Sequence, residues 1–231
     1  MNFLYKFNKD NCWYKKVCPY YNQERCDQNC IRYLKMFYLV NNSLLTEKQQ
    51  HPIKLYAEPI DEENFNLLAV IKKNIANFVN QGKNLLLHSK ITGNGKTAWA
   101  VKLLMSYFNK IWAEDDFSVR GMFINIPRFF HAIKEDIRES QDYVKHIRDN
   151  VLKVDLIIWD ELGVKTLTPY EHDYLLSYIN ARLDAGKSNI FTSNLNEKEL
   201  LEVLGNRLYS RIINSSQLIE LKGNDKRGLY D

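Results

Sequence analysis

Two groups of residues have the types and spacing for phosphate chemistry, and the first is a loop rich in glycine. The stretch HSKITGNGKTAWA, residues 88–100, contains Gly-Lys-Thr in the order that a phosphate-binding loop requires. Backbone N–H groups of this loop would point at a β-phosphate, Lys96 would reach between the β- and γ-phosphates, and Thr97 would place its hydroxyl on Mg²⁺. The predicted nucleotide ligands are Thr92, Gly93, Asn94, Gly95, Lys96, Thr97, Ala98 and Asp160.

The loop departs from the usual pattern at one position. Five residues before Gly95, where such loops usually begin with glycine, the chain has Lys90. At that point the backbone only has to leave the strand, so we expect a larger residue to be tolerated there if its backbone dihedrals stay allowed. Gly93 and Gly95 are the positions where a missing Cβ lets the backbone approach phosphate closely.

The second group is a pair of acids that follows an apolar run. The sequence DLIIWDE, residues 155–161, ends in Asp160 and Glu161. Asp160 would hold Mg²⁺ together with Thr97, and Glu161 would polarise the attacking water as a general base. Alone, the two acids could be a solvated strand end. Together with the upstream loop they predict an ATPase that hydrolyses ATP to ADP and phosphate.

Polar residues further along the chain complete the candidate site. Asn194 follows the next apolar run and could orient water near the γ-phosphate, although Asn194 or Asn196 could instead cap the following helix. Arg207 and Arg211 lie four residues apart on one helical face, where an arginine could reach the γ-phosphate on a neighbouring subunit or form a surface salt bridge. Arg227 could close onto the nucleotide from its own chain or belong to a disordered tail.

The cysteines form a third group, near the N-terminus. All four, Cys12, Cys18, Cys26 and Cys30, fall within 19 residues with the spacing C-x5-C-x7-C-x3-C. In a reducing compartment such a cluster favours a metal site over disulfides, and four thiolates suit Zn²⁺. An iron–sulfur cluster and unligated thiols are the alternatives.

Composition and charge limit the class of protein. The chain has 231 residues, of which 45% are hydrophobic and 26% are charged, which is typical of one main globular domain with a small appendage. Residues 1–50 contain eight basic side chains against four acidic ones, which suggests an acidic partner or a mildly basic solvated surface. No apolar run approaches the ~20 residues that a membrane span needs, so we expect a cytoplasmic protein.

The periodicity predicts the elements that must position these residues. Strands are expected at 84–89, 121–126, 154–160, 189–194 and 216–223, and helices at 31–45, 65–81, from residue 96, twice between 126 and 151, at 169–184 and twice after 196. Short apolar runs that alternate with helices are typical of an α/β fold, a parallel sheet sandwiched by helices. We therefore predict a cysteine-rich module at 1–45, a linker at 46–62 and a nucleotide-binding domain at 63–231.

The series TGNGKTAWA, DLIIWDELGVKT, IFTSNLNEKEL, LGNRLYSRI and KGNDKRG resembles the AAA+ ATPase domain of bacterial and phage replicative helicase loaders of the DnaC/DnaI type. IstB-type transposition helpers are close relatives of that family. The resemblance covers about residues 60–231 and implies that Asn194 is the sensor 1 residue, Arg211 the trans-acting arginine finger and Arg227 the sensor 2 arginine. It also implies that the loop after the acids contacts single-stranded DNA, which indicates Thr168 and Tyr170. In residues 1–45 only the layout is similar.

The function implied by the resemblance is that of an ATP-dependent loader. Such a protein grips a hexameric replicative helicase with its N-terminal module, places it on single-stranded DNA and self-associates through the ATP site. ATP, Mg²⁺ and Zn²⁺ are the expected cofactors. A transposition helper, a nucleotide-bound adapter without hydrolysis and a zinc-dependent DNA-binding regulator are the alternatives.

Overall fold

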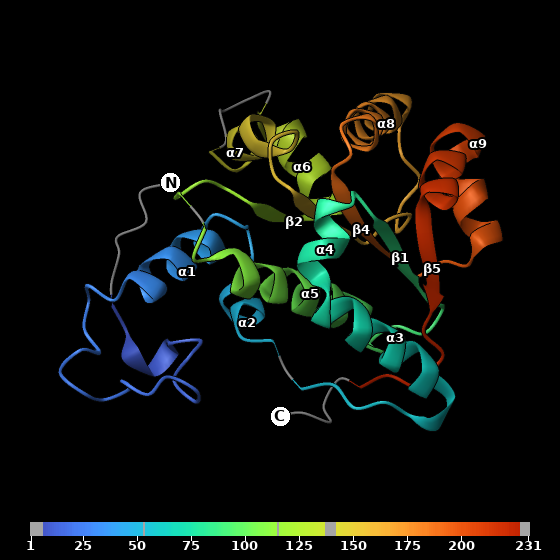
Figure 1. Cartoon of the computed structure of the whole chain (residues 1–231). Helices are drawn as coiled ribbons and strands as arrows, with labels where there is room; N and C mark the ends of the chain where they lie inside the picture. Colours follow the sequence, from blue (N-terminus) through green and yellow to red (C-terminus); the bar gives the residue numbers. More distant parts are fainter. Residues whose placement is uncertain (1–6, 53, 115, 137–141, 227–231) are drawn as a thin grey trace.

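The computed structural model describes residues 7–52, 54–114, 116–136 and 142–226 (Figure 1). At its centre lies a parallel sheet whose strands follow the order β2-β3-β4-β1-β5. Because β4 lies between β1 and β3, the loops that follow these strands meet at one edge of the sheet. The strands span Asn84–His88 (β1), Gly121–Asn125 (β2), Leu156–Asp160 (β3), Ser188–Ser193 (β4) and Ser216–Glu220 (β5), at the places predicted from the sequence.

Helices cover both faces of the sheet, as Figure 1 shows, and the predicted α/β fold is confirmed. Alternate strand residues point to opposite faces, so Leu85 and Leu87 pack in one core while Leu86 packs in the other. The first face carries α1 (Ile31–Asn41), α3 (Glu62–Lys73), α4 (Ile75–Asn80) and α5 (Lys96–Ile111). The second carries α6 (Ile126–Asp136), α7 (Asp142–Asn150), α8 (Pro169–Asp184) and α9 (Glu197–Ser215).

Some helix boundaries differ from the prediction. The helix expected at 65–81 is interrupted at Asn74, which separates α3 from α4 because its backbone leaves the helical region. The two helices expected after residue 196 form α9, which is kinked at Gly205, where φ is 69°. None of the helices in the described ranges has both the length and the apolar character that crossing a membrane requires.

The N-terminal residues pack against the end of α5. They form a short 3-10 helix, η1 (Lys9–Asn11), irregular turns and then α1, which shares a hydrophobic core with α5. The Arg32 guanidinium lies 3.4 Å from the ring centroid of Tyr14 and 5.0 Å from that of Trp112, which holds α1 to the loop after α5. The residues expected to form a linker contain α2 (Glu47–Gln50) and η2 (Pro59–Asp61).

Candidate nucleotide-binding site

The phosphate loop joins β1 to α5. Gly93 and Gly95 have φ angles of 73° and 108°, in the left-handed region that favours glycine. Gly95 is the N-cap of α5 and no side chain caps the helix there, so the first N–H groups of α5 are available to an anion. The helix dipole adds partial positive charge at the same place. The loop therefore has the geometry that a phosphate group requires.

Lys96 is 6% exposed and its ammonium group turns back onto the loop. Its Nζ donates to the carbonyl oxygen of Ile91 at 2.8 Å and to Oδ1 of Asn94 at 3.1 Å. These acceptors are neutral and belong to the loop itself, so a phosphate could replace them. Asn94, predicted as a nucleotide ligand, is fully buried and its side chain bonds within the protein.

Lys90, at the start of the loop, is not among the described residues with a positive φ. A glycine is therefore not needed there to satisfy the backbone. Its ammonium group forms an ion pair with Glu199 of α9, with 2.8 Å between Nζ and Oε1.

The predicted Mg²⁺ ligands lie in contact. The Thr97 hydroxyl donates to Oδ1 of Asp160 at 2.8 Å. The hydroxyl of Thr192 on β4 donates to the same oxygen at 2.7 Å. A hydroxyl and a carboxylate that converge beside a phosphate loop are oxygen ligands of the kind Mg²⁺ prefers, so the residues fit a Mg²⁺–nucleotide complex.

Asp160 is 4% exposed, and its surroundings disfavour its charge. Burial raises the pKa of its carboxyl group. Hydrogen bonds from Thr192, Thr97 and Asn125 lower the pKa but do not outweigh burial, and the neighbouring charge of Glu161 raises it further. A divalent cation bound here would favour the ionised form.

Glu161 has a φ of 62°, which is uncommon for a residue other than glycine. Holding such a conformation costs about 1–3 kcal/mol, and residues of this kind cluster at functional sites. The backbone N–H of Glu161 donates to Oγ1 of Thr192 at 3.1 Å, and its Oε2 accepts from Nδ2 of Asn125 at 2.9 Å. The turn therefore places the Glu161 carboxylate beside Asn125 at the end of β2.

Asn125 and Thr192 were not among the residues predicted from the sequence. Asn125 donates to Asp160 at 3.3 Å as well as to Glu161, so it links the two acids. Both residues lie at or near the carboxyl ends of parallel strands, where polar side chains gather. Their position at the end of an apolar run is the signal that could have identified them.

The other predicted side chains occupy different settings. Asn196 caps α9 with a capping box that includes Glu199, so Asn194 is not the cap. Arg207 and Arg211 are exposed on α9, and within the described part of the chain neither forms an ion pair. Arg227 lies outside the described residues.

The two predicted DNA contacts lie at the start of α8. Thr168 is the N-cap of α8, where its hydroxyl accepts from the backbone N–H of Glu171 at 3.3 Å. Tyr170 is 59% exposed and its ring lies 5.7 Å from that of Tyr174. Thr168 thus has a structural role, whereas the Tyr170 ring is open to a partner.

The cysteines are free thiols and all are half-buried. Burial raises the pKa of Cys12, and the charges of Cys30, Cys26 and Cys18 raise it further. Among the residues that the structure describes, however, no group of three or more His, Cys, Asp or Glu side chains is arranged to hold a metal ion. The residues present therefore do not form a preorganised zinc site.

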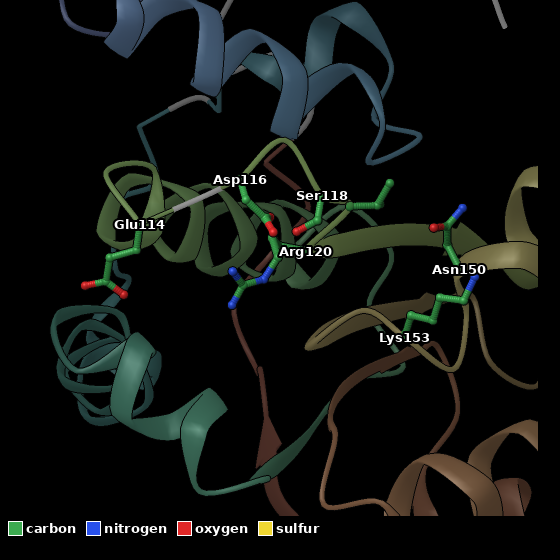
Figure 2. Close-up of a pocket in the computed structure, with 7 residues that line it drawn as sticks. Glu114, Asp116, Ser118, Arg120, Asn150 and Lys153 are labelled. Atoms are coloured by element: carbon green, nitrogen blue, oxygen red, sulfur yellow. The ribbon is translucent and has the colours of Figure 1, made fainter.

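A separate cavity lies at the opposite edge of the sheet, before the strands begin (Figure 2). It has a volume of about 350 Å³, and its lining carries charges of both signs. Arg120 lies immediately before β2, and Asn150 and Lys153 lie between α7 and β3. None of the predicted site residues lines this cavity.

A glycine-containing loop between strand and helix, a buried lysine and an acid at the end of a nearby parallel strand define a P-loop nucleotide-binding protein. The chain belongs to the family of IstB-like ATP binding proteins, whose sequence pattern matches residues 57–228. The resemblance predicted from the sequence is therefore confirmed at the level of the family.

Individual relatives agree with this assignment. The replicative helicase loader DnaC of Escherichia coli strain K12 is 25% identical over 142 residues, which cover 60% of this chain and 51% of DnaC. The chain thus matches about half the length of its curated relatives. The crystal structure of the DnaC helicase loader superposes with a TM-score of 0.63 at 20% identity, covering 77% of this chain and 100% of that one. The crystal structure of DnaI gives 0.55 at 21% identity, with 76% and 88% covered. Both structures show the same fold.

Proposed function

We propose that this protein is an ATP-dependent loader that delivers a hexameric replicative helicase onto single-stranded DNA in the cytoplasm. The main support for an ATP site is the contact of Thr97 with Asp160, which lies beside a phosphate loop where no side chain caps the start of α5. The helicase partner is supported by membership of the family and by the similarity to the helicase loader DnaC.

Each residue at the edge of the sheet has a distinct part in hydrolysis. Lys96 would neutralise charge on the β- and γ-phosphates, and Thr97 and Asp160 would hold Mg²⁺, which would supply further positive charge. Glu161 accepts a proton from the attacking water, and Asn194 orients that water. The strained backbone of Glu161 supports this assignment, because residues held in such conformations cluster at functional sites.

Self-association would complete the site. The exposed guanidinium of Arg211 is free to reach the nucleotide of a neighbouring copy, where it would stabilise charge in the transition state. Arg227 would close onto the nucleotide from its own chain. Hydrolysis would then depend on assembly of loaders side by side.

Single-stranded DNA would contact the start of α8. The exposed Tyr170 ring offers a face on which a base can stack, worth about 1–3 kcal/mol. Thr168 would place its backbone at the same surface. Loss of DNA affinity in Tyr170→Ala with ATP binding unchanged is the expected result.

The N-terminal residues would bind the helicase, and we propose that their cysteines bind one Zn²⁺. The grouping of four thiols supports this, although the side chains would have to move to form a ligand set. Metal analysis of the purified protein should find one zinc per chain. Iron with visible absorbance would indicate a cluster, and absence of metal would indicate free thiols.

The decisive experiment for the loader function is co-purification with the replicative helicase of the same host, with and without ATP. Lys96→Ala, which removes the phosphate-binding charge, is the matched control. We expect an ATP-dependent complex with the helicase that Lys96→Ala weakens. A protein that binds a transposase and no helicase would be a transposition helper, and the loader function would be rejected.

A further inference from the structure

The last described residues of the chain cross the phosphate loop. We name residues 221–226 the C-terminal strap. At its first residue, the Leu221 carbonyl oxygen accepts from Nδ2 of Asn94 at 3.0 Å, and the Leu221 N–H donates to the carbonyl oxygen of His88 at 3.0 Å. At its last, the N–H of Lys226 donates to the carbonyl oxygen of Gly93 at 3.0 Å. Both ends of the strap are therefore bonded to the phosphate loop or to the strand residue that precedes it.

Two carboxylates from the other end of the domain hold the strap. Asp61 is fully buried, and its two oxygens accept from the backbone N–H groups of Lys222 at 2.8 Å and Gly223 at 2.6 Å. Glu58 accepts from the backbone N–H of Asn224 at 2.9 Å and from its side-chain amide at 2.8 Å. Hydrogen bonds to charged groups are about twice as strong as neutral ones, so these four contacts anchor the middle of the strap.

Two residues of the strap, Gly223 and Lys226, suit the surface formed by residues 56–61. A Cβ atom at position 223 would lie 2.8 Å from Oδ2 of Asp61 and 2.8 Å from Oε1 of Glu58, so any residue larger than glycine would force the carboxylates to shift. Lys226 is 4% exposed, and its Nζ donates to the carbonyl oxygen of Tyr56 at 2.7 Å. Residues 56–61, predicted from the sequence to belong to a linker, thus form the surface on which the strap rests.

Asn94 connects the strap to the phosphate-binding lysine. Its Nδ2 donates both to Leu221 and to Oγ of Ser89, the latter at 2.7 Å. With both amide hydrogens engaged, Oδ1 is directed at Nζ of Lys96, 3.1 Å away. The strap is therefore one of the two partners that orient the Asn94 amide, which in turn accepts from the Lys96 ammonium.

We propose that Asp61 and Glu58 are positioning residues for nucleotide binding, which hold the strap over the phosphate loop and act through Asn94 on Lys96. The proposal rests on ATP binding at this loop, and it is independent of whether the partner is a helicase. A carboxylate pair about 30 residues before the loop in the sequence would thereby set its affinity for ATP.

Two isosteric variants distinguish this proposal from a general loss of charge. In Asp61→Asn one of the two backbone N–H groups must face an amide NH₂, because a backbone donor cannot be reversed. In Glu58→Gln the Asn224 amide can turn over, so both hydrogen bonds survive. We expect Mg²⁺–ATP to bind on the order of tenfold more weakly to Asp61→Asn. For Glu58→Gln the loss should stay below about threefold, because both hydrogen bonds survive and only the 3.6 Å ion pair with Lys226 is lost.

The measurements are calorimetric titration with Mg²⁺–ATP and hydrogen exchange of residues 89–95 without nucleotide. Glu62→Gln, an exposed neighbour of Asp61, is the control and should match the unmodified protein in both. Exchange in the loop should be faster in Asp61→Asn. Turnover at saturating ATP should stay within about twofold, because a positioning residue acts on affinity.

Unchanged ATP affinity in Asp61→Asn, or unchanged exchange in residues 89–95, would overturn the proposal. If the unmodified protein binds no ATP, the proposed function fails, and the exchange measurement still decides whether the strap orders the loop. Should Asp61→Asn not fold, Glu58→Ala removes the second anchor at a half-buried position. Wild-type affinity and exchange in Glu58→Ala would then reject the strap as a determinant of binding.

Discussion

The two ends of β3 each carry a buried or half-buried aspartate, and the two are held in opposite ways. Asp155 lies just before the strand, where its carboxylate accepts from Nε of Arg120 at 2.6 Å, Nζ of Lys187 at 2.9 Å and the hydroxyl of Tyr107 at 2.9 Å. Asp160 ends the strand and is bonded by hydroxyl and amide groups alone. In the described residues no cation lies within ion-pair distance of Asp160.

The pKa values of the two carboxyl groups differ accordingly. Burial raises both, but at Asp155 the bonds from Lys187, Arg120 and Tyr107 outweigh burial and lower the pKa. At Asp160 the neutral donors do not outweigh burial, and the pKa is raised. The carboxylate of Asp155 is neutralised by fixed cations and therefore has a structural role. The carboxylate of Asp160 has neutral donors and therefore remains available to bind a cation.

The buried cations show the same contrast. Arg182, at the amino end of the sheet, is fully buried, and burial lowers its pKa to about 9. Its guanidinium donates to Oδ1 of Asn189 and to the carbonyl oxygens of Val151, Val154 and Ser188 at 2.7–2.9 Å. Lys96, at the carboxyl end, donates to two neutral acceptors of its own loop, the carbonyl oxygen of Ile91 and Oδ1 of Asn94. At the amino edge of the sheet the buried charged groups are held by fixed partners, and we call it the saturated edge. At the carboxyl edge the charged groups have neutral partners that a nucleotide and Mg²⁺ could replace, and we call it the exchangeable edge.

The largest effect is expected on ATP turnover, at the proposed general base of the exchangeable edge. Glu161→Gln should lower ATP turnover by about 10²–10⁴-fold, because the amide cannot accept the proton of the attacking water. ATP affinity should change little, since the amide keeps the shape of the side chain. Phosphate release and nucleotide titration measure the two quantities. Turnover that survives in Glu161→Gln would remove the general-base role, and an exposed acid changed alike, Asp173→Asn, serves as control.

At the saturated edge the expected effect is on stability. Arg182→Leu should lower the free energy of unfolding by about 3–5 kcal/mol, because the carbonyl oxygens of Val151, Val154 and Ser188 lose their donor. Urea denaturation measures this. Lys145→Leu, which replaces an exposed cation on α7, should change the free energy by less than about 0.5 kcal/mol. Equal effects of the two substitutions would show that the Arg182 network is not a stabilising anchor.

The sequence predicted the sheet and its loop because the relevant signals are local. Apolar runs with the periodicity of buried strands and the order Gly-Lys-Thr are both read within a few residues. The contact of Thr97 with Asp160 follows from them, since the carboxyl ends of parallel strands meet at one edge.

What the sequence did not predict depends on contacts between distant residues. Asp61 lies in a polar stretch with two prolines that is typical of a linker, yet it is fully buried because residues 222 and 223 supply backbone donors from the far end of the chain. Asn125 was overlooked for a similar reason. Its amide matters only because β3 places two acids beside β2.

A direct test of the contrast along β3 compares isosteric substitutions at its two ends. Asp155→Asn should lower the free energy of unfolding by about 1–2 kcal/mol, since it weakens charged hydrogen bonds to Arg120 and Lys187. Asp160→Asn should leave the nucleotide-free protein as stable or up to about 1 kcal/mol more stable, because a disfavoured charge is removed. Denaturation without nucleotide measures both. If Asp160→Asn destabilises as much as Asp155→Asn, the two ends do not differ as described.

Glu171 tests the comparison further, because it lies near the carboxyl edge of the sheet but its carboxylate is held by Lys165, Lys134 and the backbone of Thr168. Burial alone would raise its pKa, but hydrogen bonds from Lys165, the backbone of Thr168 and Lys134 outweigh burial and lower the pKa to about 2. A lowered pKa stabilises the fold above the unfolded value of about 4.3, and this stabilisation is lost as the pH falls towards 2. Between pH 7 and pH 3 the free energy of unfolding should fall by about 1 kcal/mol less in Glu171→Gln than in the unmodified protein. The expected difference is small because Lys134 and Lys165 are exposed to solvent. An unchanged pH profile would mean that the carboxylate is not held as described.

The smallest effect is expected at Lys90, the position where a phosphate loop usually begins with glycine. The ion pair with Glu199 is largely exposed, with 62% and 35% of the two side chains accessible, so it contributes about 0.2–1 kcal/mol at most. Because Lys90 does not need a positive φ, Lys90→Gly relieves no strain and should change Mg²⁺–ATP affinity by less than about threefold. Glu199→Gln breaks the same ion pair while glutamine still serves the capping box of α9, so it separates the loss of the pair from the change at the loop. A tenfold gain in Mg²⁺–ATP affinity in Lys90→Gly, but not in Glu199→Gln, would show that the lysine weakens nucleotide binding. The first residue of the loop would then limit the affinity of the site.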